Sequence, residues 1–384
     1  MIQNMTIQRG LLGCVSAVLN GKTPEALTTG VTADDILEVG DKQDMFPITF
    51  CALHSVKPKP ESSRWGEHEK RFLDDCMRSE IQMAEYQKLI AYLCSNGVRI
   101  LPLKGCVLKG LYPSSNLRVM SDVDLLYDGV SAGRLAELME AFGYSTGNLE
   151  KGVHDTFYKK PCMNIELHRQ LVADDSPYKS ILEDMFEKAV PDKDIANLYH
   201  MKAEDLYLHV IVHAAKHFMN SGLGVRPVGD IYVLNRKYDR SWDREYIDTQ
   251  LGSVGLTKFE KKMRDMANAF FGEETQEVSE EDLKIFFKGS TYGIYSEAIR
   301  WSAMAKGRKR YILKKIFPSL SDMKMWFPIL GKYPWLYPFV MIYRWVDRLI
   351  HKFGNVKKVF ALTRISEAEE NGVKSIMKEY GLED

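Results

Sequence analysis

The sequence predicts an α+β fold in which a small mixed sheet with flanking helices is embedded in a largely helical protein. Between about residues 97 and 173, short apolar or alternating segments are separated by turn residues, which is typical of strands. On both sides of this stretch, apolar residues recur at the three- and four-residue spacing of helices. The chain has 384 residues, more than one compact domain usually holds, so we expect two or three units.

Changes in this pattern divide the chain into four predicted regions. They are an N-terminal helical region at residues 1–95, an α/β core at 96–175, a helical domain closing the cleft at 176–300, and a C-terminal helical region, basic and rich in aromatic residues, at 301–384. Short helices are expected over residues 1–60, where the prolines of Lys57-Pro58-Lys59-Pro60 end them. A long helix is predicted from Glu67 to Asn96, because apolar residues recur there at helical intervals and Asn96-Gly97 can take positive φ.

The α/β core is predicted from an alternation of strand and helix signals. Val98 to Leu103 is a short apolar run suited to a buried strand, and Lys104-Gly105 follows as a turn. The remaining predicted elements are helical turns over residues 106–111, a strand over 119–127, an amphipathic helix over 131–142, and strands over 156–160 and 163–171. After Asp174 the pattern is again helical, from Glu204 to about residue 300.

Composition restricts the classes of function. Basic and acidic residues balance at 52 each, so no global field marks a nucleic-acid binder, and any contact with nucleic acid must be local. The six cysteines are scattered without a Cys-x-x-Cys pair, which suits reduced thiols in a cytoplasm. No segment reaches the roughly 20 uninterrupted apolar residues that spanning a bilayer requires, and residues 11–19 lack the features of a signal peptide. We therefore expect a cytoplasmic protein.

The segment Asp122-Val123-Asp124-Leu125-Leu126 carries the main functional signal. Side chains on a strand alternate between faces, so Asp122 and Asp124 project together while Val123 and Leu125 point into the core. Two carboxylates this close repel each other unless a cation lies between them, and Mg²⁺ takes oxygen ligands and typically brings phosphate with it. The alternative interpretation is a carboxylate pair at a solvated sheet edge.

Two neighbouring segments favour the metal-site interpretation. Lys104-Gly105-Cys106 lies between a predicted strand and a predicted helix, where a glycine lets the backbone approach a phosphate and a helix N-terminus offers amide donors. Asn164-Ile165-Glu166-Leu167-His168 is a second alternating strand, in which Glu166 shares its face with Asn164 and His168. A third carboxylate from an adjacent strand would complete a site for two metal ions, one activating the attacking oxygen and one steadying the departing pyrophosphate.

The order Lys-Gly, then Arg-x-x-x-Asp-x-Asp-Leu-Leu, then Ile-Glu-Leu-His resembles the nucleotidyltransferase superfamily that includes DNA polymerase β and the aminoglycoside nucleotidyltransferases. Within it, the chain is most similar to a bacterial group known only as "nucleotidyltransferase family protein", over about residues 80–270. The resemblance implies a polymerase-β-like core, two Mg²⁺ ions, and transfer of a nucleoside monophosphate from a nucleoside triphosphate to an acceptor hydroxyl. It implies that Asp122 and Asp124 bind both metals, and that Glu166 binds the catalytic metal and helps to deprotonate the acceptor.

The candidate nucleotide-binding residues are Lys104, Gly105, Cys106 and Arg118. The superfamily usually has Gly-Ser or Gly-Gly in the phosphate turn, whereas Cys106 follows Gly105 here, so we expect Lys104 and backbone amides to carry more of the triphosphate contact. For Arg118 two interpretations stay open, namely a bidentate contact with the triphosphate and a surface ion pair with Asp122 or a neighbour.

Candidates for the acceptor side of the cleft are His168, His213, His217 and Asp230. His209, His213 and His217 recur every fourth residue and share one helical face, for which packing, a cleft wall and a zinc site are alternatives. The zinc alternative lacks a His-Glu-x-x-His motif. Asp230 is expected either to fix one of these rings in a chosen tautomer or to tether its own loop.

Two features of the C-terminal region lie outside this site. The basic run Lys306, Arg308, Lys309, Arg310, Lys314 and Lys315 is expected to be a solvated helix face, with RNA, a phosphorylated substrate and an anionic membrane surface as alternatives. The tryptophans and tyrosines between Trp326 and Trp345 are expected to close a helical core, the alternative being a partner patch or peripheral membrane contact.

Two hypotheses of function follow from these patterns. The first is a Mg²⁺-dependent nucleotidyltransferase whose acceptor is unknown: a sugar, a small molecule, a protein side chain or an RNA end. The second is a non-catalytic nucleotide-binding or regulatory protein that retains the nucleotidyltransferase fold, which the altered phosphate turn favours and the retention of three carboxylates disfavours.

Overall fold

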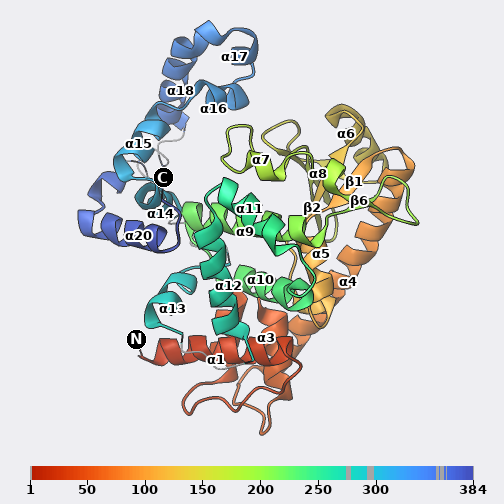
Figure 1. Cartoon of the computed structure of the whole chain (residues 1–384), viewed down its shortest axis with the longest axis vertical. Helices are drawn as coiled ribbons and strands as arrows, with labels where there is room; N and C mark the ends of the chain where they lie inside the picture. The colour runs from red at the N-terminus through yellow and green to blue at the C-terminus, as the bar shows by residue number, and fades with distance from the viewer. Residues whose placement is uncertain are drawn as a thin grey trace. The chain divides into compact units, whose positions relative to one another are not determined.

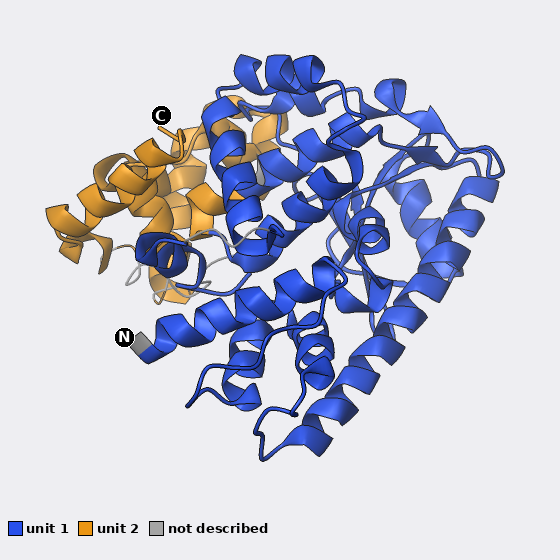
Figure 2. Ribbon diagram, turned by 60° about the horizontal axis from the view of Figure 1, so that its bottom comes forward, with its two compact units in different colours: residues 1–214, 223–291 blue, residues 215–222, 292–384 orange. Residues whose placement is uncertain are grey.

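The computed structural model of the protein describes residues 2–273, 278–291, 298–351 and 361–383, together with residues 354 and 359. The chain forms two compact units, which Figure 2 colours separately. Unit 1 comprises residues 1–214 and 223–291, and unit 2 comprises residues 215–222 and 292–384. The predicted α+β fold is confirmed, because a five-stranded mixed sheet in unit 1 is accompanied by helices along most of the described chain.

Four helices precede the sheet in unit 1. They are α1 (Ile2–Leu19), α2 (Ala33–Lys42), α3 (Phe46–Ser55) and α4 (Trp65–Ser95). Helix α1 packs against α2, α3 and the later helix α12 (Thr257–Phe271). Figure 1 shows α1 beside α3 and α12. The long helix predicted from Glu67 to Asn96 is confirmed as α4, whereas α1 is one helix of 18 residues and not a short helix as predicted.

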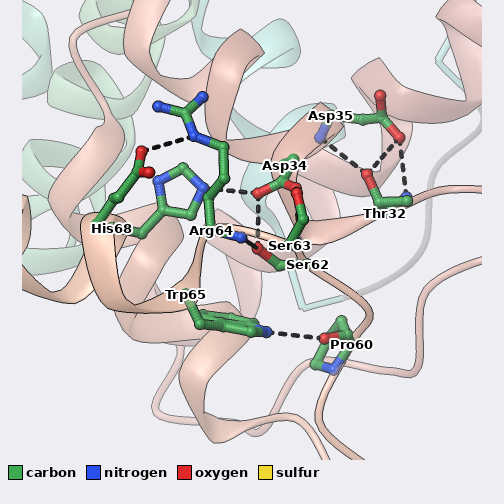
Figure 3. Close-up of polar contacts among 10 residues, drawn as sticks. Thr32, Asp34, Asp35, Pro60, Ser62, Ser63, Arg64, Trp65 and His68 are labelled. Atoms are coloured by element: carbon green, nitrogen blue, oxygen red, sulfur yellow. Dashed lines mark hydrogen bonds and ion pairs between the residues drawn. The ribbon is translucent and has the colours of Figure 1, made fainter.

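Polar contacts hold the segment before α4 to the start of α2 (Figure 3). Asp34 accepts a hydrogen bond from the Ser62 hydroxyl at 2.7 Å and another from the Ser63 amide at 3.2 Å. Its Oδ1 also lies 2.6 Å from Nε2 of His68 on α4. Burial acts to raise the pKa of Asp34, but these hydrogen bonds outweigh it and leave the pKa below its ordinary value. Ionised Asp34 on α2 therefore holds in place the segment that leads into α4.

The sheet combines one parallel pair with antiparallel neighbours. Its strands are β1 (Arg99–Pro102), β2 (Val123–Asp128), β3 (Ser145–Thr146), β4 (His154–Lys159) and β5 (Met163–His168), and their spatial order is β1-β2-β5-β4-β3. Strands β2 and β5 run parallel, and the other pairs are antiparallel. The sheet is therefore mixed, as predicted.

Several strand ends differ from the predicted ones. Strand β2 begins at Val123 rather than at Val119, because residues 115–117 form a 3₁₀ turn and the chain enters the sheet only after Met120. Strand β5 ends at His168 rather than at Leu171. Strand β4 begins at His154, two residues before the predicted start at Thr156.

One face of the sheet is covered by α4 and by α6 (Ala132–Ala141). Val123 and Leu125 of β2 and Ile165 and Leu167 of β5 are fully buried on this face. They pack against side chains of the two helices, including Leu89, Leu93, Leu135 and Met139. Because strand side chains alternate, Asp124 and Glu166 project from the opposite face.

Short elements connect the sheet to the helical part of unit 1. Between β1 and β2 lie α5 (Lys104–Leu108) and the 3₁₀ turns at Lys109–Leu111 and Ser115–Leu117. After β5 come α7 (Lys179–Leu182), α8 (Met185–Lys188), β6 (Val190–Pro191), β7 (Tyr199–His200), α9 (Ala203–Ser221), α10 (Val225–Tyr238), α11 (Arg244–Ser253), α12 and α13 (Glu280–Phe286). The antiparallel pair of β6 and β7 was not predicted.

Unit 2 is helical throughout its described part. Its helices are α14 (Ala298–Ala305), α15 (Arg308–Ile316), α16 (Leu320–Trp326), α17 (Ile329–Lys332), α18 (Tyr337–His351) and α20 (Glu367–Glu379), with 3₁₀ turns at Pro334–Leu336 and Leu362–Arg364. Phe218, from the part of α9 that belongs to this unit, stacks on Tyr380 with ring centroids 4.7 Å apart. Within the described residues, no helix is both long enough and apolar enough to cross a membrane.

The prediction that the C-terminal aromatic residues close a helical core is wrong for four of them. Trp326, Tyr333, Trp335 and Tyr343 are exposed to solvent. The small core of this part is formed by Met323, Leu330 and Met341, with Phe327, Leu336, Tyr337, Val340 and Trp345 packed around it. That core is too small to cover the remaining aromatic rings.

Candidate active site

Three carboxylates converge where β2 and β5 run side by side. In the parallel register Asp124 lies directly opposite Glu166, and Asp122 immediately precedes β2. The carboxylate oxygens that Asp122, Asp124 and Glu166 can offer lie within 4.8 Å of one another. Such oxygens are the ligands that a hard divalent cation prefers, so these three side chains could hold Mg²⁺.

Burial and charge set the protonation of the two aspartates. Burial acts to raise the pKa of Asp124, but the Lys104 ammonium and a hydrogen bond with His168 outweigh it, so the pKa lies well below its ordinary value. Asp122 behaves in the opposite way, because burial and then the charge of Asp124 raise its pKa, with Lys104 acting against them. The cluster thus holds more negative charge than Lys104 compensates, which a bound cation would relieve.

Lys104 is the cation that the structure places against this cluster. Its Nζ lies 3.0 Å from Oδ2 of Asp124, and 18% of the lysine side chain is exposed. Lys104 begins α5, directly after the strand β1 that pairs with β2. The turn between β1 and α5 therefore positions the Lys104 ammonium beside the three carboxylates.

Gly105 and Cys106 follow Lys104 on α5, and both are buried. The Cys106 side chain belongs to the core cluster beneath the sheet, and its Sγ lies 4.0 Å from the backbone oxygen of Asp124. Burial raises the pKa of the Cys106 thiol to about 12, so the thiol is neutral. Any contact between Cys106 and a phosphate would therefore have to come from its backbone.

Arg118 is neither on a strand nor at the surface, contrary to the surface ion pair considered from the sequence. It follows the 3₁₀ turn at Ser115–Leu117, and it is 5% exposed. Its guanidinium forms a buried bidentate ion pair with Asp230 on α10, and Asp122 is not its partner in that pair. Asp230 also accepts a hydrogen bond from Tyr112 at 2.9 Å, so it tethers α10 to the segment preceding β2.

His154 joins the acidic cluster, and the sequence did not predict this. It lies opposite His168 in the β4–β5 pairing, with ring centroids 4.9 Å apart. Nε2 of His154 and Nε2 of His168 each lie 3.6 Å from Oε2 of Glu166. These three side chains form a second group able to hold a metal ion, with two nitrogen donors and one oxygen donor. Extending the predicted strand back by one alternation from Thr156 would have found His154.

The three histidines of α9, unlike His154 and His168, do not belong to the group of side chains around Glu166. His209 and His213 belong to unit 1, and His217 belongs to unit 2. Among the described residues, the two groups of side chains that could hold a metal ion include none of these three histidines. The zinc alternative therefore receives no support from the geometry.

A cavity of about 260 Å³ lies beyond the carboxyl ends of β2 and β5. Its lining includes Leu126, Asp128, Gln170, Lys179 and Phe186. Leu126 is two residues after Asp124, so both side chains leave the same face of the strand. The cavity lies at the carboxyl end of β2, and its lining includes none of the three clustered carboxylates.

A small mixed sheet whose adjacent strands bring three carboxylates together is the arrangement of a nucleotidyltransferase. The chain belongs to the family of uncharacterised nucleotidyltransferases, whose family model matches residues 29–272, well over half of its length. The predicted resemblance is therefore confirmed, and the match also includes the helices α2 and α3 that precede α4. No curated protein and no solved structure matches the chain.

Proposed function

We propose that the protein is a Mg²⁺-dependent nucleotidyltransferase that moves a nucleoside monophosphate from a nucleoside triphosphate to an acceptor hydroxyl. The observation that carries the proposal is the convergence of Asp122, Asp124 and Glu166 from two neighbouring strands. Membership of the nucleotidyltransferase family supports it. Three mutually repelling carboxylates on one sheet face have a physical reason to stay together if they share a cation.

The donor set fits the metal that this reaction needs. Asp122, Asp124 and Glu166 would hold Mg²⁺ through carboxylate oxygens, which is the chemistry that this ion prefers. When bound there, Mg²⁺ would neutralise charge on the triphosphate and lower the pKa of the attacking hydroxyl. Lys104, now 3.0 Å from Asp124, would contact the triphosphate from the same side.

The remaining roles fall to side chains around the cluster. The acceptor oxygen forms a bond to the α-phosphorus while the bond from that phosphorus to the bridging oxygen breaks, and pyrophosphate leaves with the electron pair. Glu166 would take the proton of the acceptor hydroxyl. His168 lies 3.2 Å from Asp124 and 3.6 Å from Glu166, where it would orient both carboxylates. The acceptor would occupy the cavity lined by Leu126 and Gln170, which lies at the carboxyl ends of the same two strands.

Paired binding and turnover assays test the proposal. Titration calorimetry with Mg²⁺ and a non-hydrolysable analogue of each nucleoside triphosphate should show metal-dependent binding of at least one of them. The double variant Asp122→Asn with Asp124→Asn should lose this binding while its circular dichroism stays unchanged. Asp74→Asn is the matched control, since Asp74 is an exposed carboxylate on α4 that belongs neither to the cluster nor to the cavity. Equal binding by the double variant and the wild type would refute the assignment of the site.

A binding protein without turnover is the second candidate, and one observation favours it. The Cys106 thiol is buried, so the turn after Lys104 offers no side-chain hydroxyl to a phosphate. Labelled triphosphate mixed with candidate sugars, small hydroxyl compounds, proteins and RNA would separate the two candidates. Tight Mg²⁺-dependent binding with no label transferred to any acceptor would favour the second.

A further inference from the structure

Unit 2 presents a large apolar surface that the proposed nucleotide chemistry does not use. Among the described residues, fourteen large apolar side chains between Leu313 and Ile350 are exposed to solvent. Six of them belong to α18 and define what we call the apolar stripe: Phe339, Ile342, Tyr343, Val346, Leu349 and Ile350. An exposed patch formed by several large apolar side chains marks an interaction site.

The apolar stripe is one face of a helix and not a scatter of side chains. Its members are spaced by three, one, three, three and one residues, which places them on one side of α18. Their exposed fractions run from 49% for Val346 to 67% for Ile350. On an ordinary surface helix this face would be turned toward the core.

The opposite face of α18 is fixed, so the stripe cannot turn inward. Arg344 is 3% exposed, and its guanidinium donates to the backbone oxygens of Lys315 at 3.0 Å and Ile316 at 3.4 Å. The indole of Trp345 donates to the Ile316 oxygen at 3.0 Å. Rotating α18 would leave a buried guanidinium without these acceptors, which is strongly unfavourable.

Charge and aromatic content indicate which partner covers this surface. Residues 306–351 contain ten lysines and arginines but only two aspartates, Asp322 and Asp347. Lys309 and Lys314 on α15 are exposed, as are Trp326 and Trp335 nearby in the sequence. Helices that lie in a membrane interface combine an apolar face with tryptophan and basic residues. Anionic lipid attracts the basic residues.

We propose that unit 2 docks peripherally on an anionic lipid bilayer, with the apolar stripe inserted at the headgroup boundary and the exposed lysines of α15 held against lipid phosphates. A nucleic acid would match the basic residues but would leave the apolar stripe in water. A second copy of the chain would match the stripe, but it would bring the same excess of basic residues against the first copy, and like charges repel. A bilayer with anionic headgroups satisfies both.

Vesicle flotation with the full chain tests this proposal. The protein should float with vesicles of phosphatidylcholine containing about one-third phosphatidylglycerol, and at least about tenfold less with phosphatidylcholine alone. Raising the salt from about 0.1 M to about 0.5 M should weaken the binding, because screening acts on the lysines. Trp335, which is 68% exposed, should give a blue shift of the fluorescence on binding, and Trp335→Phe should reduce it.

Matched variants make the test specific. Ile342→Ser with Val346→Ser and Leu349→Ser should weaken vesicle binding at least about tenfold, since three inserted side chains are lost. Leu73→Ser with Met77→Ser is the control, because these side chains on α4 are equally exposed, at 59% and 64%, but lie in unit 1. Lys309→Gln with Lys314→Gln should weaken binding only to the anionic vesicles.

Three results would overturn the proposal. They are failure of the wild type to bind anionic vesicles, full binding by the triple serine variant, and a dimer in sedimentation equilibrium that the triple variant dissociates. The last would assign the stripe to a second copy of the chain. None of them bears on nucleotide binding, because the acidic cluster and the apolar stripe belong to different units.

Discussion

Arg118 and Asp230 form a buried bidentate ion pair across 112 residues of sequence. Nε of Arg118 donates to Oδ1 of Asp230 at 2.7 Å, and Nη2 donates to Oδ2 at 2.8 Å. The pair connects α10 to the segment that enters β2, and thus to the backbone that carries Asp122 and Asp124. The ion pair therefore helps to position the segment that carries Asp122 and Asp124.

Arg118→Met should destabilise the protein by about 3–5 kcal/mol, because it leaves the Asp230 carboxylate buried without its cation. Adding Asp230→Asn should recover part of the loss, since no lone charge remains and the asparagine oxygen can still accept from Tyr112. Urea unfolding followed by circular dichroism measures both effects. If Arg118→Met instead unfolds like the wild type and loses only nucleotide affinity, Arg118 acts on the triphosphate rather than on Asp230.

Cys106→Ser should leave nucleotide affinity unchanged, although it restores the Gly-Ser pair usual in the superfamily. The side chain at this position points into the core beneath the sheet, where a hydroxyl can donate to the Asp124 carbonyl as the thiol does. Calorimetry with the Mg²⁺-nucleotide analogue measures the affinity. A large gain in affinity would mean that residue 106 faces the phosphates. In the wild type, iodoacetamide at pH 8 should leave the Cys106 thiol unmodified, because its pKa is raised to about 12.

His154→Gln should change which metals the site prefers. His154 and His168 add nitrogen donors beside Glu166, and nitrogen suits Zn²⁺ and Co²⁺ but not Mg²⁺. We expect wild-type protein to bind Co²⁺ with visible absorption bands, and the variant to bind it at least about tenfold more weakly, as when a supporting ligand is lost. Mg²⁺-dependent nucleotide binding should persist in the variant. Equal Co²⁺ affinity in both proteins would show that His154 is not a ligand.

Asp34→Asn should lower the free energy of unfolding at neutral pH by about 0.5–1.5 kcal/mol, the net scale of an ordinary hydrogen bond, because solvent screens the partly exposed carboxylate. The pKa of folded Asp34 lies below its ordinary value of 3.8, so its contribution is fully present above that value and is lost as the pH falls through the folded pKa. The difference in melting temperature between wild type and variant should thus vanish as the pH falls below the folded pKa of Asp34. Asp74→Asn, an exposed change on α4, provides the control. If the difference in melting temperature persisted at low pH, the effect of Asp34→Asn would come from packing and not from the charge of Asp34.

The strands that carry the carboxylates could be predicted because their signal is local. Val123 and Leu125 alternate with acidic residues, as do Ile165 and Leu167, and alternation specifies which side chains share a face. The sequence therefore predicted that the two aspartates project together and that Glu166 comes from a second strand. The order of strands carries no such local signal, since β5 lies between β2 and β4.

Contacts that depend on pairing register or on distant segments could not be predicted. His154 faces Glu166 only because β4 pairs with β5 in one particular register. Arg118 meets Asp230 only once α10 has packed beside the segment preceding β2. The exposure of the C-terminal aromatic rings depends on how few apolar residues the core of that part contains, and the aromatic composition by itself suggested the opposite.

The parallel pairing of β2 with β5 also has a consequence for how the candidate site assembles during folding. Asp122 and Asp124 are synthesised well before Glu166, and the three meet only when β5 inserts beside β2. A chain in which β5 has not yet paired with β2 thus lacks the third carboxylate of the candidate site. Assembly of the candidate site during folding therefore depends on one step, the docking of the six-residue strand β5.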